Sequence, residues 1–340
     1  MNEITGYYET AIHPGQINIY YTAFKPSPKN HSGPWDPDSD IKSTTKVPVQ
    51  FKDNSHHGVI SKNALRKITR AVNYLCYLVP KRRQFTTADA RSGSYFLNFI
   101  TLTLSSKQIH SDNEIKRTIL EPFLNECRKR WHVTNYIWRA ERQENGNVHF
   151  HIISDRFIWW NDLRNSWNYF QERLGYVSRY RLAMREFHSQ GFRLREDLQD
   201  RWPVSKQINA WREGIRTDWN SPNSTDVHSL KTISNVRSYL AKYITKADGL
   251  DVIEGRLWGC SYDLTGLTGA REFADGHISE DIKTLLRSQQ VKTYKTDFYT
   301  VIYFSPGVLS SLHCLIILSC LKTYLKTRFP LYHPPDLWDP

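Results

Sequence analysis

Apolar and polar residues alternate near the middle of the chain, where residues 146–155 read GNVHFHIISD. Successive side chains on a β-strand point to opposite faces of the sheet. A strand here places His149 and His151 on one face and Phe150 on the other. The pattern therefore predicts a strand with an apolar face and with two imidazoles side by side on its second face. Taken alone, an HxH strand also fits a solvent-exposed face that happens to carry histidine.

The segments before this strand alternate between strand and helix patterns. A β-rich run, FLNFITLTLS, covers residues 96–105. Ser111 and Glu114 then form a capping box that opens a helix, in which Pro122 predicts a kink. A second strand, over residues 133–143, leads into the HxH strand.

An amphipathic helix is expected after the HxH strand, over residues 160–175. Its inward positions are Trp160, Leu163, Trp167 and Leu174. The resulting order, β-α-β-β-α, predicts the α+β class, with a ferredoxin- or RRM-like antiparallel sheet and flanking helices.

The flanking regions have different patterns. Residues 26–54 contain many Pro, Ser, Asp, Lys and His residues with little apolar periodicity, which indicates a loop or linker. Ser61 is placed to cap a helix with an apolar stripe and several basic residues, which form either a solvated face or a DNA contact. We expect an accessory region with a linker over 1–90, a central catalytic domain over 91–270 and a C-terminal extension over 271–340.

Residues 298–321 form an uncharged, largely apolar run that is long enough to span a membrane. Pro306 and Gly307 divide the run, so we expect a buried strand followed by a buried helix and no membrane partner. The chain starts MNEITGYYET, which has no secretory pattern, and its five cysteines are widely spaced without a CxxC pair. These features favour a reducing cytoplasm and argue against a disulfide framework or structural zinc.

The chain is basic, with 46 Lys and Arg against 34 Asp and Glu and a net charge of +12. This excess suggests a polyanionic partner such as nucleic acid. The sequence contains no GxxxxGK[ST] phosphate-binding loop, so neither a Walker-type NTPase nor a fused helicase is expected.

The turn before the HxH strand decides whether the histidines have a third partner. A two-residue type I′ turn at Asn145 and Gly146 sets Arg142 opposite His149. A three-residue loop with Gly146 left-handed sets Glu141 there instead. The second register clusters one carboxylate with two imidazoles, a set that suits a divalent ion such as Mg²⁺ or Mn²⁺ and also fits Zn²⁺. The sequence permits both registers, and the chemistry downstream favours the second.

That chemistry lies in NVRSYLAKYITKAD, residues 235–248. Tyr239 and Tyr243 are four residues apart, and so are Lys242 and Lys246, so each pair forms a row on a helix. Tyrosines packed in a core beside solvated lysines would give the same pattern. A tyrosine nucleophile has a free pKa of about 10 and needs a polarised phosphate and a nearby cation. The histidine strand and this helix together supply both.

These residues resemble the HUH (His-hydrophobic-His) endonuclease superfamily, and specifically the rolling-circle replication initiators of small single-stranded DNA phages and related plasmids. FITLTLS resembles the first family motif, ERQENGNVHFH the second with its acidic ligand, and YLAKYITK the third with its tyrosines. The resemblance covers roughly residues 96–265.

The resemblance implies an HUH endonuclease fold and an activity that nicks and rejoins single-stranded origin DNA through a 5′-phosphotyrosine. It implies Glu141, His149 and His151 as metal ligands, Tyr243 and Tyr239 as nucleophiles, and a host cell's cytoplasm, helicase and polymerase as the setting. Lys242 and Lys246 would bind phosphate oxygens. A relaxase or transposase of the same superfamily and a non-catalytic single-stranded DNA-binding protein are the rival functions.

Weaker candidates complete the set. Asp226 and His228 alternate as on a strand and could support the metal ligands, although a structural role fits them as well. Basic residues that could contact the DNA backbone, or simply be solvated, are Lys81, Arg82, Arg83, Arg179, Arg181 and the stretch from Arg128 to Arg130.

Overall fold

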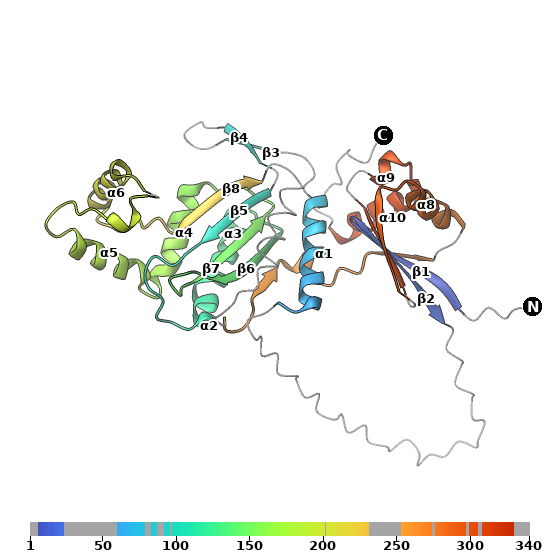
Figure 1. Ribbon diagram of the computed structural model, residues 1–340, viewed down its shortest axis with the longest axis horizontal. Coiled ribbons are helices and arrows are strands. Elements are labelled where there is room, and N and C mark those ends of the chain that lie inside the picture. Colours follow the sequence, from blue (N-terminus) through green and yellow to red (C-terminus); the bar gives the residue numbers. More distant parts are fainter. Residues whose placement is uncertain are drawn as a thin grey trace, which may run out of the picture. The chain divides into compact units, whose positions relative to one another are not determined.

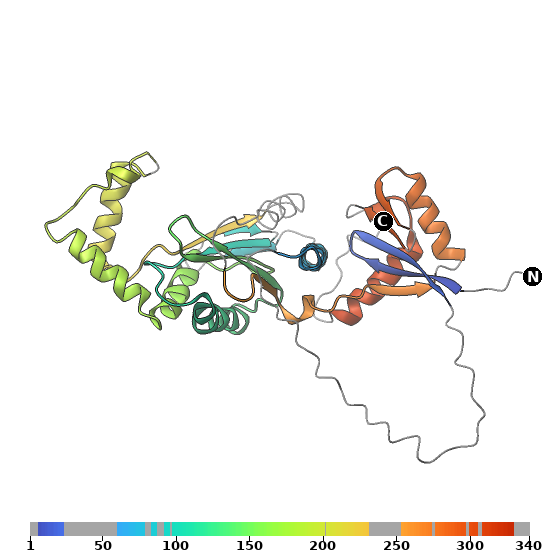
Figure 2. The same ribbon diagram turned by 60° about the horizontal axis from the view of Figure 1, so that its bottom comes forward.

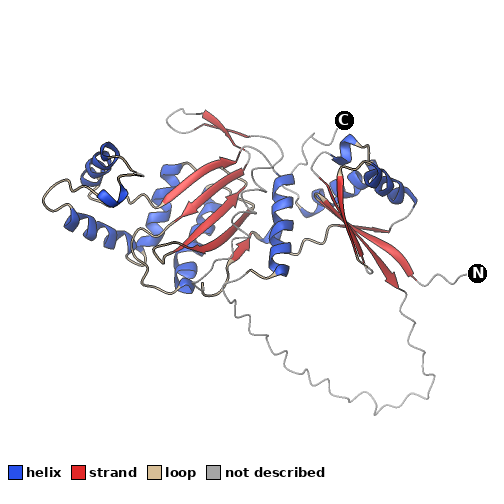
Figure 3. Cartoon of the chain, in the orientation of Figure 1, coloured by secondary structure: helices blue, strands red, loops and turns tan. Residues whose placement is uncertain are grey.

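The computed structural model describes residues 6–23, 60–78, 83–86, 92–95, 97–200, 202–230, 253–273, 276–296, 299–304 and 308–329. These residues form two compact units, each with its own five-stranded antiparallel sheet and its own helices (Figure 3). The described residues within 56–267 form the central unit, and those within 6–23 and 268–329 form the terminal unit. The predicted α+β class is confirmed.

The central unit contains the sheet that carries the HxH strand. Its strands are β5 (Leu97–Leu102), β6 (Tyr136–Arg142), β7 (Val148–Ser154), β8 (Thr225–Leu230) and β9 (Trp258–Cys260), in the spatial order β8-β5-β7-β6-β9. All neighbours are antiparallel. A separate hairpin consists of β3 (Arg83–Thr86) and β4 (Ser92–Tyr95). The three strands predicted around the histidines are therefore present, and HFH lies at the centre of β7.

Helices cover one face of this sheet, as Figure 2 shows from below. They are α2 (Asp112–Ile115), the π-helical turn η1 (Lys116–Leu120), α3 (Glu121–Arg130) and α4 (Trp160–Glu172). Phe150, the residue between the two histidines, is fully buried on this face, 6.3 Å from the ring of Trp167 and 6.1 Å from that of Trp138. Because the apolar residues of β7 face these helices, its histidines must face the other way.

The helix after Ser111 begins as predicted. The hydroxyl of Ser111 accepts a hydrogen bond from the backbone N–H of Glu114 at 3.2 Å. Before Pro122 the helix widens into η1, and the N–H of Glu121 donates to the carbonyl of Lys116, five residues back. Proline cannot donate to the carbonyl four residues before it, so this π-helical turn accommodates the predicted irregularity.

One inward position of α4 was predicted wrongly. Leu163 and Trp167 are fully buried, but Trp160 is 41% exposed, with the guanidinium of Arg164 stacked 4.8 Å from its ring centroid. Helical periodicity places Trp160 on the same face as Trp167. However, Trp160 is the first residue of the helix, and a cation–π contact covers its ring in place of the core.

Two further parts of the central unit follow α4 and precede the sheet. A helical arm of α5 (Tyr176–Phe187), η2 (Glu196–Leu198) and α6 (Val204–Arg216) lies between α4 and β8 in the chain (Figure 1). The predicted helix after Ser61 is α1 (Lys62–Leu78), whose Ile68, Val72 and Leu75 are buried. It lies beside β6 and η3 (Tyr262–Leu264).

The terminal unit joins strands from both ends of the described chain. Its sheet has the order β10-β1-β2-β12-β11, built from β1 (Gly6–His13), β2 (Gln16–Ala23), β10 (Ala270–Phe273), β11 (Val291–Lys295) and β12 (Tyr299–Phe304). Its helices are α8 (Gly276–Arg287), α9 (Val308–Ser311) and α10 (Leu315–Arg328).

The apolar run over 298–321 forms a strand and then helices, as predicted. β12 ends at Phe304 and α9 starts at Val308, whereas Pro306 and Gly307 lie outside the described residues. None of the helices in the described ranges combines the length and the apolar composition that crossing a bilayer requires.

The contacts group the chain differently from the three consecutive segments that we expected. β1 pairs with both β2 and β10, so residues near the N-terminus join those after 268 in one sheet, while α1 belongs to the central unit. Local sequence patterns predict strands but not which distant strands pair, because pairing depends on the tertiary fold.

Candidate metal centre

The hairpin between β6 and β7 adopts the three-residue loop. Gly146 has a φ of 82°, and the N–H of Gln143 donates to the carbonyl of Asn147 at 2.9 Å. Glu141 is directly opposite His149, and Arg142 is opposite Val148. The type I′ register is therefore excluded, and Glu141 shares a face of the sheet with both histidines.

A buried ion pair fixes this hairpin from the helical side. Arg142 donates to both carboxylate oxygens of Asp112, at 3.0 and 2.7 Å, and Asp112 also accepts from Gln108 and from the N–H of Glu254. Gln108 in turn accepts from the N–H of Val148 at 2.7 Å. The start of β7, one residue before His149, is thus tied to the helix that begins at Asp112.

We expect Asp112→Asn to destabilise the central unit by about 3 kcal/mol, because it breaks a buried bidentate pair and leaves the charge of Arg142 without its counter-ion. Urea unfolding followed by tryptophan fluorescence measures the change. Glu213→Gln is the control, since it removes an exposed i,i+3 pair with Arg216 and should leave the transition unchanged. Equal transitions for Asp112→Asn and wild type would show that the pair contributes nothing.

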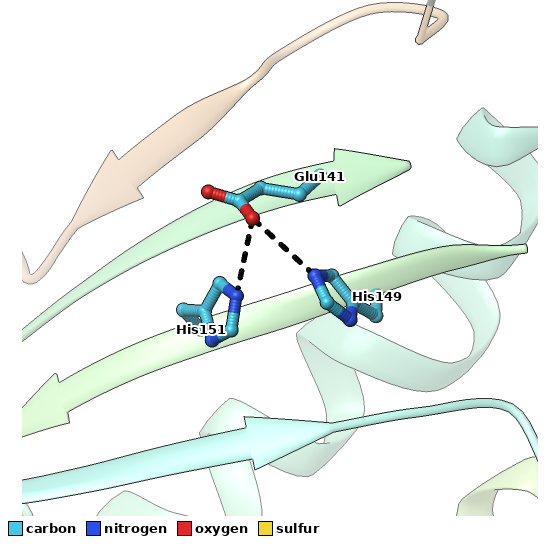
Figure 4. A group of neighbouring side chains, drawn as sticks. All are labelled: Glu141, His149 and His151. Atoms are coloured by element: carbon cyan, nitrogen blue, oxygen red, sulfur yellow. Dashed lines mark hydrogen bonds and ion pairs between the residues drawn. The ribbon is translucent and has the colours of Figure 1, made fainter. Parts of the chain in front are cut away.

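Three side chains converge on the open face of the sheet. Nε2 of His149 lies 3.4 Å and Nε2 of His151 3.3 Å from the same carboxylate oxygen, Oε2 of Glu141 (Figure 4). Their potential ligand atoms all lie within 4.8 Å of one another. The side chains are only 8 to 15% exposed, so little solvent competes for these atoms.

The charges around Glu141 keep it ionised. Burial by itself would raise the pKa of this carboxyl, but hydrogen bonds from His149 and His151 and the charge of Arg139 lower it to about 2. Nη1 of Arg139 lies 3.4 Å from Oε1 of Glu141, and both side chains are buried. Glu141 is therefore a carboxylate at any physiological pH.

His151 is held as a neutral imidazole. Burial lowers its pKa, and the neighbouring His149 lowers it further, against the opposing effect of Glu141. Its Nδ1 lies 3.2 Å from the hydroxyl oxygen of Thr101, and its ring stacks on Phe99 with 5.3 Å between centroids. When Nδ1–H donates to Thr101, the lone pair of Nε2 points toward Glu141 and can bind a metal.

This set of donors fits a divalent cation. Two imidazole nitrogens and one carboxylate oxygen lie on one face with positions left for other ligands, which suits Mn²⁺ or Mg²⁺ and is also compatible with Zn²⁺. His149 supports this reading, since its Nδ1 is buried and has no hydrogen-bond partner among the described residues. A ring held only through Nε2 is free to adjust toward an ion.

We expect Mn²⁺ affinity to change little between about pH 8 and pH 7 and to fall as the pH drops below about 6.5. The sign follows from His151. Its lowered pKa leaves it neutral above the ordinary histidine value of 6.5, and protons compete with the metal only below that value. Glu141, with a pKa of about 2, stays ionised throughout. Calorimetric titrations at several pH values test this, and a loss of affinity already between pH 8 and pH 7 would contradict it.

The structure does not describe the predicted nucleophiles. Tyr239, Tyr243, Lys242 and Lys246 lie in the segment 231–250, outside the described residues, so their roles remain predictions. Lys81 and Arg82 also lie outside the described residues. Arg83 belongs to β3, whose side chains are not described.

The other basic candidates lie away from the two histidines. Arg179 is exposed on α5, and Arg181 forms an ion pair with Asp218 in the helical arm. Arg128, Lys129 and Arg130 form the last turn of α3, on the helix-covered side of the sheet. Contact with DNA bound over the metal centre is therefore not expected from α3.

Asp226 and His228 lie on the same sheet face as the histidines. Asp226 is opposite Thr101, which is itself opposite His151. Asp226 and His228 form an ion pair with each other at 2.7 Å, and both are more than half exposed. A polar rim of the site describes them better than direct support for a ligand.

Sequence reasoning missed Thr101 and Arg139, which contact His151 and Glu141 directly. Both follow the two-residue alternation that predicted the histidines: Thr101 lies in the ITL stretch of FITLTLS, and Arg139 precedes Glu141 by two positions. Extending the face assignment from β7 to its two neighbouring strands would have identified them.

Comparison with known families locates the similarity in this unit. Residues 97–248 match the family described as Replication-associated protein ORF2. The matched range contains β5 to β8, the three candidate ligands and the YxxKYxxK segment. No curated protein and no solved structure matches the chain. The predicted resemblance to replication initiators is thus confirmed over these residues.

Proposed function

Because residues 97–248 carry a replication-associated protein region, we propose that this chain starts rolling-circle replication by nicking and rejoining single-stranded origin DNA. The observation that carries the proposal is the buried cluster of Glu141, His149 and His151 on the open face of the central sheet. In the same matched region, Tyr239 and Tyr243 follow in the sequence with a lysine three residues after each.

The protein's part in the first step is to hold a phosphodiester beside a nucleophile. Glu141, His149 and His151 would hold a divalent ion, which when bound polarises a phosphate oxygen. Arg139 keeps the Glu141 carboxylate ionised and in place. The hydroxyl oxygen of Tyr243 attacks phosphorus, and its proton passes to solvent. Lys242 or Lys246 offsets the charge that develops on the phosphate.

The bonds balance in each direction. A tyrosine–phosphorus ester forms while the bond from phosphorus to the 3′ oxygen breaks, and that oxygen takes up a proton to become a free 3′-OH. One ester replaces another, so the step needs no nucleotide hydrolysis. A new 3′-OH can later attack the phosphotyrosine and reseal the strand. The sequence has no Walker-type loop, so strand separation and synthesis are assigned to host helicase and polymerase.

The test is covalent capture. Single-stranded oligonucleotides that tile the replicon encoding this chain are incubated with the protein and Mn²⁺ and separated under denaturing conditions. We expect one oligonucleotide to give a protein–DNA band that chelator abolishes, and relaxed duplex of the same sequence to give little. Efficient cleavage in chelator, equal cleavage of duplex, or no adduct with any oligonucleotide would contradict the proposal.

A further inference from the structure

The sheet of the terminal unit has one buried and one open face. Residues that alternate along its strands, including Ile12, Ile17 and Ile302, are fully buried, and α10 packs against β1 and β10. Their neighbours in the sequence point to the second face, on which several side chains are exposed. This second face is called the tyrosine face below.

Tyrosines line the tyrosine face in a diagonal row. Tyr20 of β2 is directly opposite Tyr299 of β12, and the ring of Tyr299 lies 6.3 Å from that of Tyr294 on β11. Tyr303 follows Tyr299 by four residues and so lies on the same face. Tyr294, Tyr299 and Tyr303 are 57, 37 and 45% exposed. Tyr7 extends the row on β1, two residues before the partner of Tyr20, Glu9.

The side chains between the rings are polar or basic. Lys292 is opposite Tyr303 by strand register and is exposed, and Arg271 is largely exposed on β10. Asn18 and Gln16 form a hydrogen-bonded amide pair beside Val301 and Tyr303. The aliphatic residues on this face, Ala11 and Val301, are buried. Among the described residues, the face therefore exposes aromatic rings without an aliphatic patch, which a protein-binding core would need.

This combination fits unpaired nucleobases. Exposed rings on a flat sheet stack on bases of any sequence, amides and hydroxyls bond to base edges, and lysine and arginine contact phosphates. The charges agree with this ligand, since two cations, Lys292 and Arg271, accompany one carboxylate, Glu9, and the whole chain carries +12. An anionic, base-bearing polymer complements the face, whereas an acidic or aliphatic protein surface would leave the rings poorly matched.

We propose that the tyrosine face of the terminal unit, formed by Tyr20, Tyr294, Tyr299 and Tyr303 with Lys292, is a second binding site for single-stranded DNA. It lies outside the family match at residues 97–248 and shares no residue with the metal centre. DNA rather than RNA is the expected ligand because the matched region is that of a replication-associated protein. The proposal does not depend on the cleavage chemistry.

The test uses the full chain and a fluorescein-labelled oligo(dT) of about 30 nucleotides, in chelator, so that no cleavage interferes. We expect the double variant Tyr294→Ala/Tyr299→Ala to bind at least about tenfold more weakly. The matched control is Tyr8→Ala/Tyr21→Ala, which removes two similarly exposed rings, 59 and 44%, from the opposite face of the same sheet. It should bind within about twofold of wild type.

Crosslinking separates this site from the central unit. The full chain carrying His149→Ala is irradiated with an iodouracil-substituted oligonucleotide, and the adducts are mapped by mass spectrometry. We expect adducts in peptides spanning β11 and β12. Adducts confined to residues 56–267 together with unchanged affinity of the double variant would overturn the proposal. Tighter binding of oligo(U), or a change in sedimentation of the double variant without a change in DNA affinity, would also overturn it, by indicating RNA or a protein partner.

Discussion

Replacing Tyr243 by Phe should reduce covalent adduct formation on an origin oligonucleotide by at least about 1,000-fold. The substitution removes one oxygen, the atom proposed to attack phosphorus, and leaves the ring. Without that oxygen no phosphotyrosine can form at this position, whatever the metal and lysines contribute. The readout is the fraction of labelled oligonucleotide that migrates with the protein under denaturing conditions.

Tyr239→Phe is the matched variant, because both tyrosines begin a YxxK and differ by one helical turn. We expect this variant to make the first cut and to fail to release closed circles, since the second transfer lacks its hydroxyl. If Tyr239→Phe completes both steps as wild type does, Tyr239 is a packing residue. If Tyr243→Phe nicks normally, the primary nucleophile is Tyr239.

Replacing His149 by Ala should weaken Mn²⁺ binding by about 100-fold or more and abolish metal-dependent nicking. The imidazole supplies one of three converging donor atoms, and its loss leaves Glu141 and His151 to hold an ion alone. Calorimetry measures the affinity without reference to activity, so a failed nucleophile and a failed metal site can be told apart.

His228→Ala is the control for this variant. His228 lies on the same face of the sheet, but it is more than half exposed and pairs with Asp226. We expect it to keep both Mn²⁺ affinity and the first nick. A His149→Ala protein that still nicks with Mn²⁺ would rule out the proposed centre. One that binds origin DNA normally without nicking would exclude the rival reading of a non-catalytic DNA-binding protein, for which His149 has no chemical task.

The parts of this protein that the sequence determined are local. The two-residue alternation of HFH set both histidines on one face, because a strand's backbone geometry allows no other arrangement. Ser111 at a helix start and the break at Pro122 follow equally from the chemistry of one or two residues. The family resemblance also depended on short motifs, and its match to residues 97–248 agrees with them.

What only the tertiary structure decided is how distant segments meet. The sequence permitted either Arg142 or Glu141 opposite His149, since both turns are open to Asn145 and Gly146. In the fold, Arg142 lies two residues after the buried Ala140, on the helix-covered face, where Asp112 from α2 binds its guanidinium. That contact, between residues thirty positions apart, directs Glu141 to the opposite face beside the histidines. The pairing of β1 with β10 has the same cause, because contacts between remote segments leave no periodic trace in either one.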